Sequence, residues 1–84
     1  MTEAPVVIDT LGAACPIPVI ELAKAVNRAD AGTVFEVLSD DAAAKVDIPV
    51  WCRMKHHEYL GSEVRDRGWA FMVRVVASQP TAKI

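Results

Sequence analysis

The segment from Asp9 to Pro18 places a glycine turn, a cysteine and two closely spaced prolines directly before an amphipathic stretch. Proline suits the first position of a helix, because its φ is preset and its missing N–H would have no partner there. We therefore expect a helix to start at Pro16, with Cys15 as its N-cap residue. A chain with this segment must turn sharply at Gly12 and continue as a helix with one sulfur at its start.

The position of Cys15 predicts a reactive thiol. The N-terminus of a helix carries a partial positive charge and free backbone N–H groups, so it favours an anion. Since prolines have no N–H, the amide of Ile17 is the nearest one left to hold a sulfur anion. The thiolate is the nucleophilic form, so we expect a lowered pKa and a sulfur that can attack or carry another group. The alternative is that Cys15 is a small buried hydrophobe and the prolines merely start a helix.

The composition indicates one small globular domain. With 84 residues, of which 52% are hydrophobic, the chain can bury one modest core. Its net charge of −2, with scattered basic residues, is unlike the basic stripe of a nucleic-acid binder. No apolar run approaches the roughly 20 residues of a membrane span, and the first residues lack the pattern of a signal peptide. We expect a cytoplasmic protein with no membrane or nucleic-acid partner, whose two cysteines are thiols.

Hydrophobic periodicity predicts a strand, a helix and a second strand in the first half of the chain. The β-branched run 6–8 is typical of a buried strand, and residues 33–38 form the second strand. The helix runs from about Pro16 to Arg28, and Gly32 supplies a left-handed turn after it. Its core stripe consists of Val19, Leu22, Ala23 and Val26.

The second half begins with a less regular helical region. The side chains of Ser39, Asp40 and Asp41 offer oxygens that can cap it. Pro49 is expected to break or kink the region, so that residues 42–46 form a turn and Asp47 recaps a helix over residues 48–56. Two strands follow, over residues 59–66 and 69–77, and they are joined by a hairpin turn in which Gly68 takes a positive φ.

The resulting order βαβαββ predicts an α/β fold, a two-layer sandwich with two helices on one face of a four-stranded mixed sheet. We expect residues 1–84 to form a single domain. Its ordered core spans about residues 6–77, and residues 78–84, which show no pattern, form a flexible tail.

The motif Asp9-x-x-Gly12-x-x-Cys15-Pro16-x-Pro18 resembles the signature of the TusA/SirA-like sulfur carrier family. The resemblance extends over residues 6–77, through Ser39-Asp40-Asp41, Asp47-Ile48-Pro49-x-Trp51-Cys52 and His57-Glu58. It implies a small α/β sandwich in which Cys15 takes a sulfane sulfur as a persulfide and passes it to a partner. Such a chain is a sulfurtransferase-type carrier without a cofactor rather than a stand-alone enzyme. Its partners are a sulfur donor, either a cysteine desulfurase or a rhodanese-like protein, and an acceptor protein.

The other motif residues are expected to shape the site rather than touch sulfur. Asp9 is interpreted as a turn aspartate that bonds nearby backbone amides, Gly12 as a residue in a conformation closed to side chains, and Pro16 and Pro18 as setting the geometry. In the family member that serves tRNA 2-thiouridine synthesis, a basic residue precedes the cysteine and a glutamate separates the prolines.

Ala14 and Ile17 occupy those two positions here. The rim of the site is therefore expected to be apolar and uncharged, which argues against tRNA thiolation, because rim charges steer partner docking. An exposed Ile17 beside Cys15 would offer a small apolar docking patch.

Cys52 is expected to be a buried core residue, although a role as a secondary thiol stays open. Together with His56 and His57 it resembles part of a zinc site, but such a site needs four ligands, and Cys15 is the only other cysteine or histidine. No metal site is therefore predicted, and His57 is expected to end the helix as a favourable cation.

Two other functions remain open from the sequence. One is a non-catalytic interaction or regulatory module that docks through the Cys-Pro-x-Pro loop. The other is a thiol redox protein that uses Cys15 and Cys52.

Overall fold

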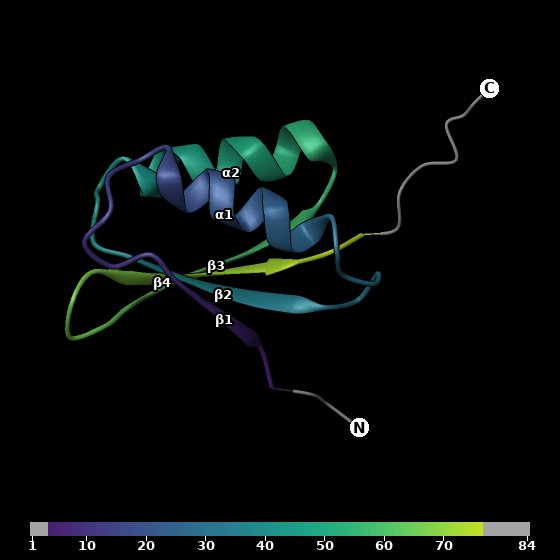
Figure 1. Cartoon of the computed structure of the whole chain (residues 1–84), viewed down its shortest axis with the longest axis horizontal. Helices are drawn as coiled ribbons and strands as arrows, with labels where there is room; N and C mark the ends of the chain where they lie inside the picture. Colours follow the sequence, from purple (N-terminus) through teal and green to yellow (C-terminus); the bar gives the residue numbers. More distant parts are fainter. Residues whose placement is uncertain (1–3, 77–84) are drawn as a thin grey trace.

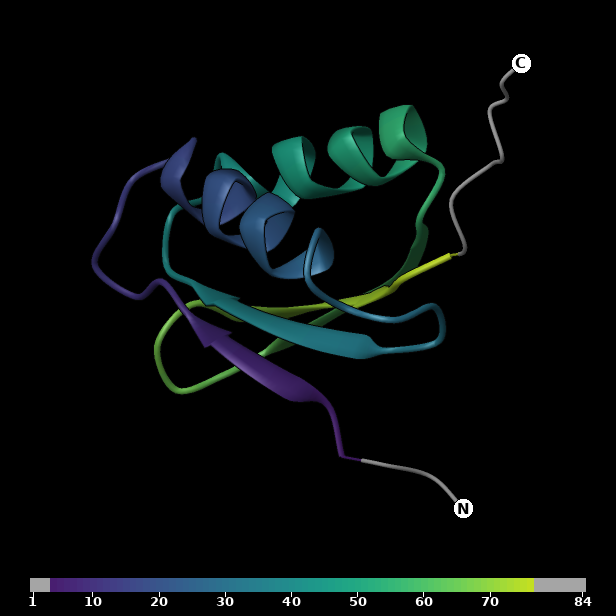
Figure 2. The same cartoon turned by 45° about the vertical axis from the view of Figure 1, so that its right-hand side comes forward.

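The polypeptide forms two layers, a four-stranded sheet and a pair of helices that cover one face of it (Figures 1 and 2). The computed structural model describes residues 4–76. The elements are β1 (Val6–Asp9), α1 (Ile17–Val26), β2 (Val34–Ser39), α2 (Ala44–Lys55), β3 (Glu58–Val64) and β4 (Trp69–Arg74). The predicted α/β class and the order βαβαββ are confirmed, whereas the predicted tail 78–84 and Ala77 lie outside the described residues. Neither helix in residues 4–76 is long and apolar enough to span a membrane.

The sheet is mixed, with the strand order β1-β2-β4-β3. β1 and β2 run parallel because α1 returns the chain between them, while β4 is antiparallel to both β2 and β3. The hairpin between β3 and β4 has Gly68 at φ 75°, as predicted. β1 lies at the edge, so Val6 and Val7 remain 50% and 55% exposed. The predicted strand at residues 6–8 is present, and Ile8 is half-buried against the core. The predicted burial of Val6 and Val7 is wrong, because β1 has a neighbouring strand on one side only.

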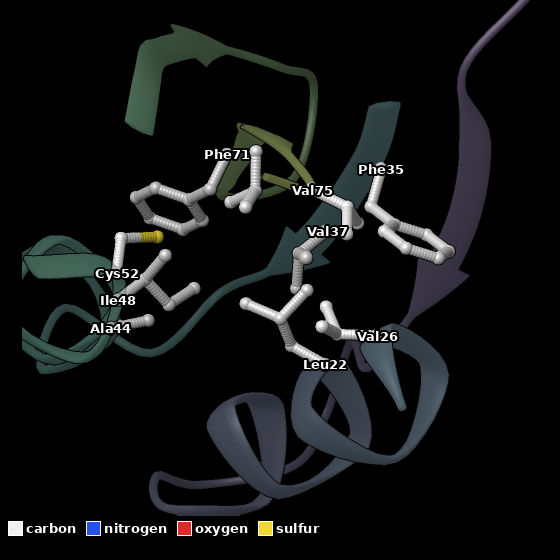
Figure 3. Packing of buried hydrophobic residues seen from close by; sticks show 10 residues of the cluster. Leu22, Val26, Phe35, Val37, Ala44, Ile48, Cys52, Phe71 and Val75 are labelled. Carbon is white, nitrogen blue, oxygen red and sulfur yellow. The ribbon is translucent and has the colours of Figure 1, made fainter. Parts of the chain in front are cut away.

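The hydrophobic core lies between the sheet and the two helices (Figure 3). Alternate residues of the strands point inward, so that Val37 of β2 and Phe71 of β4 are fully buried. Leu22 of α1 and Ile48 of α2 close the core from the helical side. Figure 3 shows the sulfur of Cys52 directed at the ring of Phe71. Cys52 is therefore part of the core packing.

The second helix, α2, continues through Pro49 without the break that the sequence predicts. Ala44, Ile48 and Cys52 follow at four-residue spacing, and each is at most 1% exposed, so burial favours one continuous helix. Proline removes one helical hydrogen bond, here to the carbonyl of Lys45, and Lys45 is an exposed residue. The prediction that Asp47 recaps a separate helix is wrong, because tertiary packing outweighs the local signal.

Candidate functional site

The loop between β1 and α1 carries Cys15, and its first residues are fastened to β2. The backbone N–H and the hydroxyl of Thr10 both donate to the carbonyl oxygen of Leu38, at 2.9 and 2.6 Å. Asp9 Oδ1 accepts the N–H of Leu11 at 2.9 Å, which is the contact predicted for it. The loop therefore leaves the sheet at a fixed point.

Two aspartates that follow β2 hold the rest of this loop. Asp40 Oδ1 accepts the N–H of Gly12 at 3.0 Å, and Asp41 Oδ2 accepts the N–H of Cys15 at 2.7 Å. Gly12 has φ 87°, the positive φ expected of it. The sequence predicts only a capping role for these aspartates. Asp41 does bond the N–H of Ala43 before α2, but its bond to Cys15 was missed.

The β3–β4 turn packs against the segment of Ser39 and Asp40 that follows β2. Arg67 Nε donates to Asp40 Oδ2 at 2.8 Å. Gly68 approaches so closely that a Cβ there would overlap the carbonyl oxygen of Ser39 and lie 2.6 Å from the Cα of Asp40. The turn and the two aspartates therefore hold the Cys15 loop as one packed unit.

The first helix, α1, begins one residue later than predicted. Its N-cap is Pro16, whose carbonyl accepts the N–H of Ile20 at 2.9 Å, so Cys15 lies before the cap. The N–H of Ile17 donates to the carbonyl of Ala14 at 3.0 Å. Its predicted role as a donor to a sulfur anion is therefore wrong, because the turn before the helix already uses this amide. The Ile17 side chain is 43% exposed, as predicted.

The thiol of Cys15 is half-buried and packs against the edge of the core. Burial raises its pKa to about 11, and a hydrogen bond to the Asp47 carboxylate, with the charges of Asp47 and Asp41, acts in the same direction. The predicted lowering of this pKa is therefore wrong, because burial and then the neighbouring carboxylates of Asp47 and Asp41 outweigh the partial positive charge of the helix end. Asp41 is ionised, since the N–H groups of Ala43 and Cys15 lower its pKa.

The predicted uncharged rim is wrong for the same reason. Ala14 and Ile17 are apolar, but Asp41 and Asp47 bring carboxylates to Cys15 from the segment before α2 and from its first turn. The site therefore combines an apolar side with an acidic one.

The remaining candidate residues lie in different surroundings. Cys52 is 1% exposed, as predicted, and burial raises its pKa to about 11. His57 Nδ1 accepts the N–H of Val76 at 3.1 Å, and its ring stacks on Trp51. Desolvation and the neighbouring His56 lower the pKa of His57, so it is a neutral acceptor and not the predicted cation. Within residues 4–76, no three His, Cys, Asp or Glu side chains gather as a metal site would require.

The chain is similar to proteins described as sulfur carriers. A family model described as "Sulfurtransferase TusA" matches residues 6–75. The "Putative sulfur carrier protein" of Archaeoglobus fulgidus is 35% identical over 69 residues, which cover 82% of this chain and 94% of that protein. The "Putative sulfur carrier protein YrkF" of Bacillus subtilis is 36% identical over 63 residues, or 75% of this chain, and the matched part spans only 34% of that protein.

A solved structure agrees with these sequence matches. The crystal structure of a SirA-like protein from Desulfitobacterium hafniense matches with a TM-score of 0.65 at 32% identity. The match covers 88% of this chain and 99% of that chain. The similarity therefore extends over nearly the whole two-layer fold.

Proposed function

This chain belongs to the TusA sulfurtransferase family, and we propose that it carries sulfane sulfur as a persulfide on Cys15 and relays it between partner proteins. The observation that carries this proposal is the difference in access to its two thiols. Cys15 is half-buried on a fastened loop before α1, whereas Cys52 is 1% exposed. A carrier must present its sulfur to another protein, and Cys15 is the thiol that another protein can reach.

The proposed transfer is an exchange between a thiol and a persulfide. The sulfur of Cys15 attacks the outer sulfur of a persulfide on the donor, the S–S bond of the donor breaks, and the donor sulfur leaves with the electron pair. The proton of the Cys15 thiol balances the charge of the leaving group. Cys–SH and R–S–SH thus become Cys–S–SH and R–SH, with no net oxidation and no cofactor in the balance. The same exchange in the other direction discharges the sulfur to an acceptor thiol.

This chemistry requires protein partners on both sides. We assign the donor to the cysteine desulfurase or rhodanese-like class and place the exchange in the cytoplasm, where thiols stay reduced. Ile17 and Ile20 of α1 are 43% and 42% exposed, which supports an apolar docking area beside Cys15. A redox role that pairs Cys15 with Cys52 has less support, because Cys52 is packed inside the core.

Intact mass spectrometry tests the proposal after incubation with a cysteine desulfurase and cysteine. We expect the wild-type chain to gain about 32 Da, and a reductant to reverse the gain. Cys15→Ser should remove the gain, and the matched variant Cys52→Ser should keep it. A wild-type gain in Cys15→Ser would contradict the proposal. If the donor is charged with sulfur and the wild-type chain gains no mass, the result would favour a non-catalytic module that docks through the Cys-Pro-x-Pro loop. A loss of about 2 Da would indicate a disulfide between Cys15 and Cys52.

A further inference from the structure

The first strand, β1, leaves one edge of the sheet open (Figures 1 and 2). Among the described strands, only β2 lies beside it. The N–H of Thr10 donates to the carbonyl of Leu38 on β2, so the alternation of a strand turns the N–H and carbonyl groups of Val7 and Asp9 away from β2. The side chains of Val6 and Val7 are half-exposed. Unpaired backbone groups and exposed apolar side chains make such an edge a template for another strand.

A groove of about 290 Å³ lies between this edge and the first helix. It is lined by Val7, Ile8, Glu21, Lys24, Ala25 and Arg28. Glu21 and Arg28 are seven residues apart, which places them about two helical turns apart on the same side of α1. Among residues 4–76, Arg28 is in no ion pair, and Glu21 pairs with Lys24 at 3.5 Å. This side of α1 is therefore acidic toward its start and basic toward its end, so it is complementary to a reversed copy of itself.

We propose that this edge binds a second copy of the chain, with the two β1 strands paired antiparallel about a two-fold axis at Val7. Two-fold symmetry requires a strand that pairs with its own copy to run antiparallel to it. The N–H and carbonyl of Val7 bond those of the other Val7, and the N–H of Asp9 bonds the carbonyl of Pro5 in the second copy. On the helical face of the joined sheets, Val6 of each copy lies opposite Ile8 of the other. These apolar cross-strand pairs stabilise the register.

The same axis places the two α1 helices side by side in opposite directions, because α1 runs antiparallel to β1. Glu21 of each copy then faces Arg28 of the other. A short strand and two exposed ion pairs make a small interface, so we expect a dissociation constant on the order of 100 µM. Neither Cys15 nor Asp41, which holds its N–H, belongs to this interface. The inference therefore goes beyond the proposed function and does not depend on it.

Sedimentation velocity of the full chain, with a reductant present to exclude disulfide-linked dimers, measures the association. Up to about 1 mM, or tenfold above the expected constant, we expect the sedimentation coefficient to rise toward that of a dimer. Val7→Lys puts two ammonium groups side by side at the axis and should weaken the association at least about tenfold. The matched variant Val50→Lys changes a valine of similar exposure on α2 and should leave it unchanged.

A chain that stays monomeric over this range would overturn the inference and leave the edge to a strand of a different protein. Equal losses in Val7→Lys and Val50→Lys would also overturn it, because the contact would not be specific to β1.

Charge reversal tests the placement of the helices. Arg28→Glu brings two carboxylates together at each end of the interface, and Glu21→Arg brings two guanidinium groups together there. Each variant alone should self-associate about tenfold more weakly than wild type. An equal mixture of the two variants again sets a carboxylate against a guanidinium group at both ends, so mixed dimers should form with nearly wild-type strength. A mixture that associates no better than its components would overturn the two-fold arrangement.

Discussion

The two cysteines of this chain have thiol pKa values raised to the same level, about 11, for different reasons. For Cys52 the cause is burial in the core, on the inner face of α2. For Cys15 burial is joined by the hydrogen bond and charge of Asp47 and by the charge of Asp41. Burial in a core persists as long as the fold does, whereas a docking protein can neutralise a carboxylate. The same raised pKa therefore comes from packing alone at Cys52 and from packing together with nearby charge at Cys15.

The largest effect on stability is expected from a substitution in the β3–β4 turn, which packs against the segment that holds the Cys15 loop. Gly68→Ala puts a Cβ against the backbone of Ser39 and Asp40 at a φ of 75°. Steric overlap and the strain of a left-handed backbone conformation at an alanine should together lower the free energy of unfolding by about 2–4 kcal/mol. Urea denaturation measures this loss. Amide hydrogen exchange should also quicken at Gly12 and Cys15, because the displaced segment holds both amides.

Gly32→Ala is the matched control for this substitution. Gly32 also has a positive φ, 94°, but a Cβ there meets no atom within 4 Å. Only the backbone strain remains, so we expect a loss of about 1 kcal/mol. Equal losses in the two variants would show that the close approach of the turn to Ser39 does not matter for stability.

A smaller effect is expected when serine replaces each cysteine in turn. At Cys52 the new hydroxyl lies in the core without a polar partner, which should cost about 1–3 kcal/mol. At Cys15 the side chain is only half-buried, so water can reach the new hydroxyl, and the change should stay within about 0.5 kcal/mol. Urea denaturation measures both losses, and similar values would remove the structural distinction between the two positions.

The order of elements could be predicted because it depends on local patterns. The spacing of Leu22 and Val26 indicates one helix, and the turn at Gly68 indicates the final hairpin. The continuity of α2 could not be predicted, since the signal of Pro49 is local. The burial of Ile48 and Cys52 that opposes this signal depends on the sheet beneath them.

The electrostatics of the site were not predicted, because they depend on residues far apart in the sequence. Asp41 lies 26 residues after Cys15, and only the fold brings its carboxylate to the Cys15 amide. One signal was available. The carboxyl ends of parallel strands meet at one edge of a sheet, so the segments after β1 and β2 are neighbours. Applied to this chain, that rule places Asp40 and Asp41 beside the Cys15 loop and corrects the expectation of an uncharged rim.

The most direct test of the central claim is to locate the sulfur after loading. The wild-type chain is charged by a cysteine desulfurase with cysteine, the persulfide is trapped by alkylation, and the two cysteine-containing peptides are weighed separately. We expect the extra sulfur, about 32 Da beyond the alkyl group, on the peptide with Cys15 and none on the peptide with Cys52. Sulfur on the Cys52 peptide, or an equal share on both, would contradict the assignment of Cys15 as the carrier.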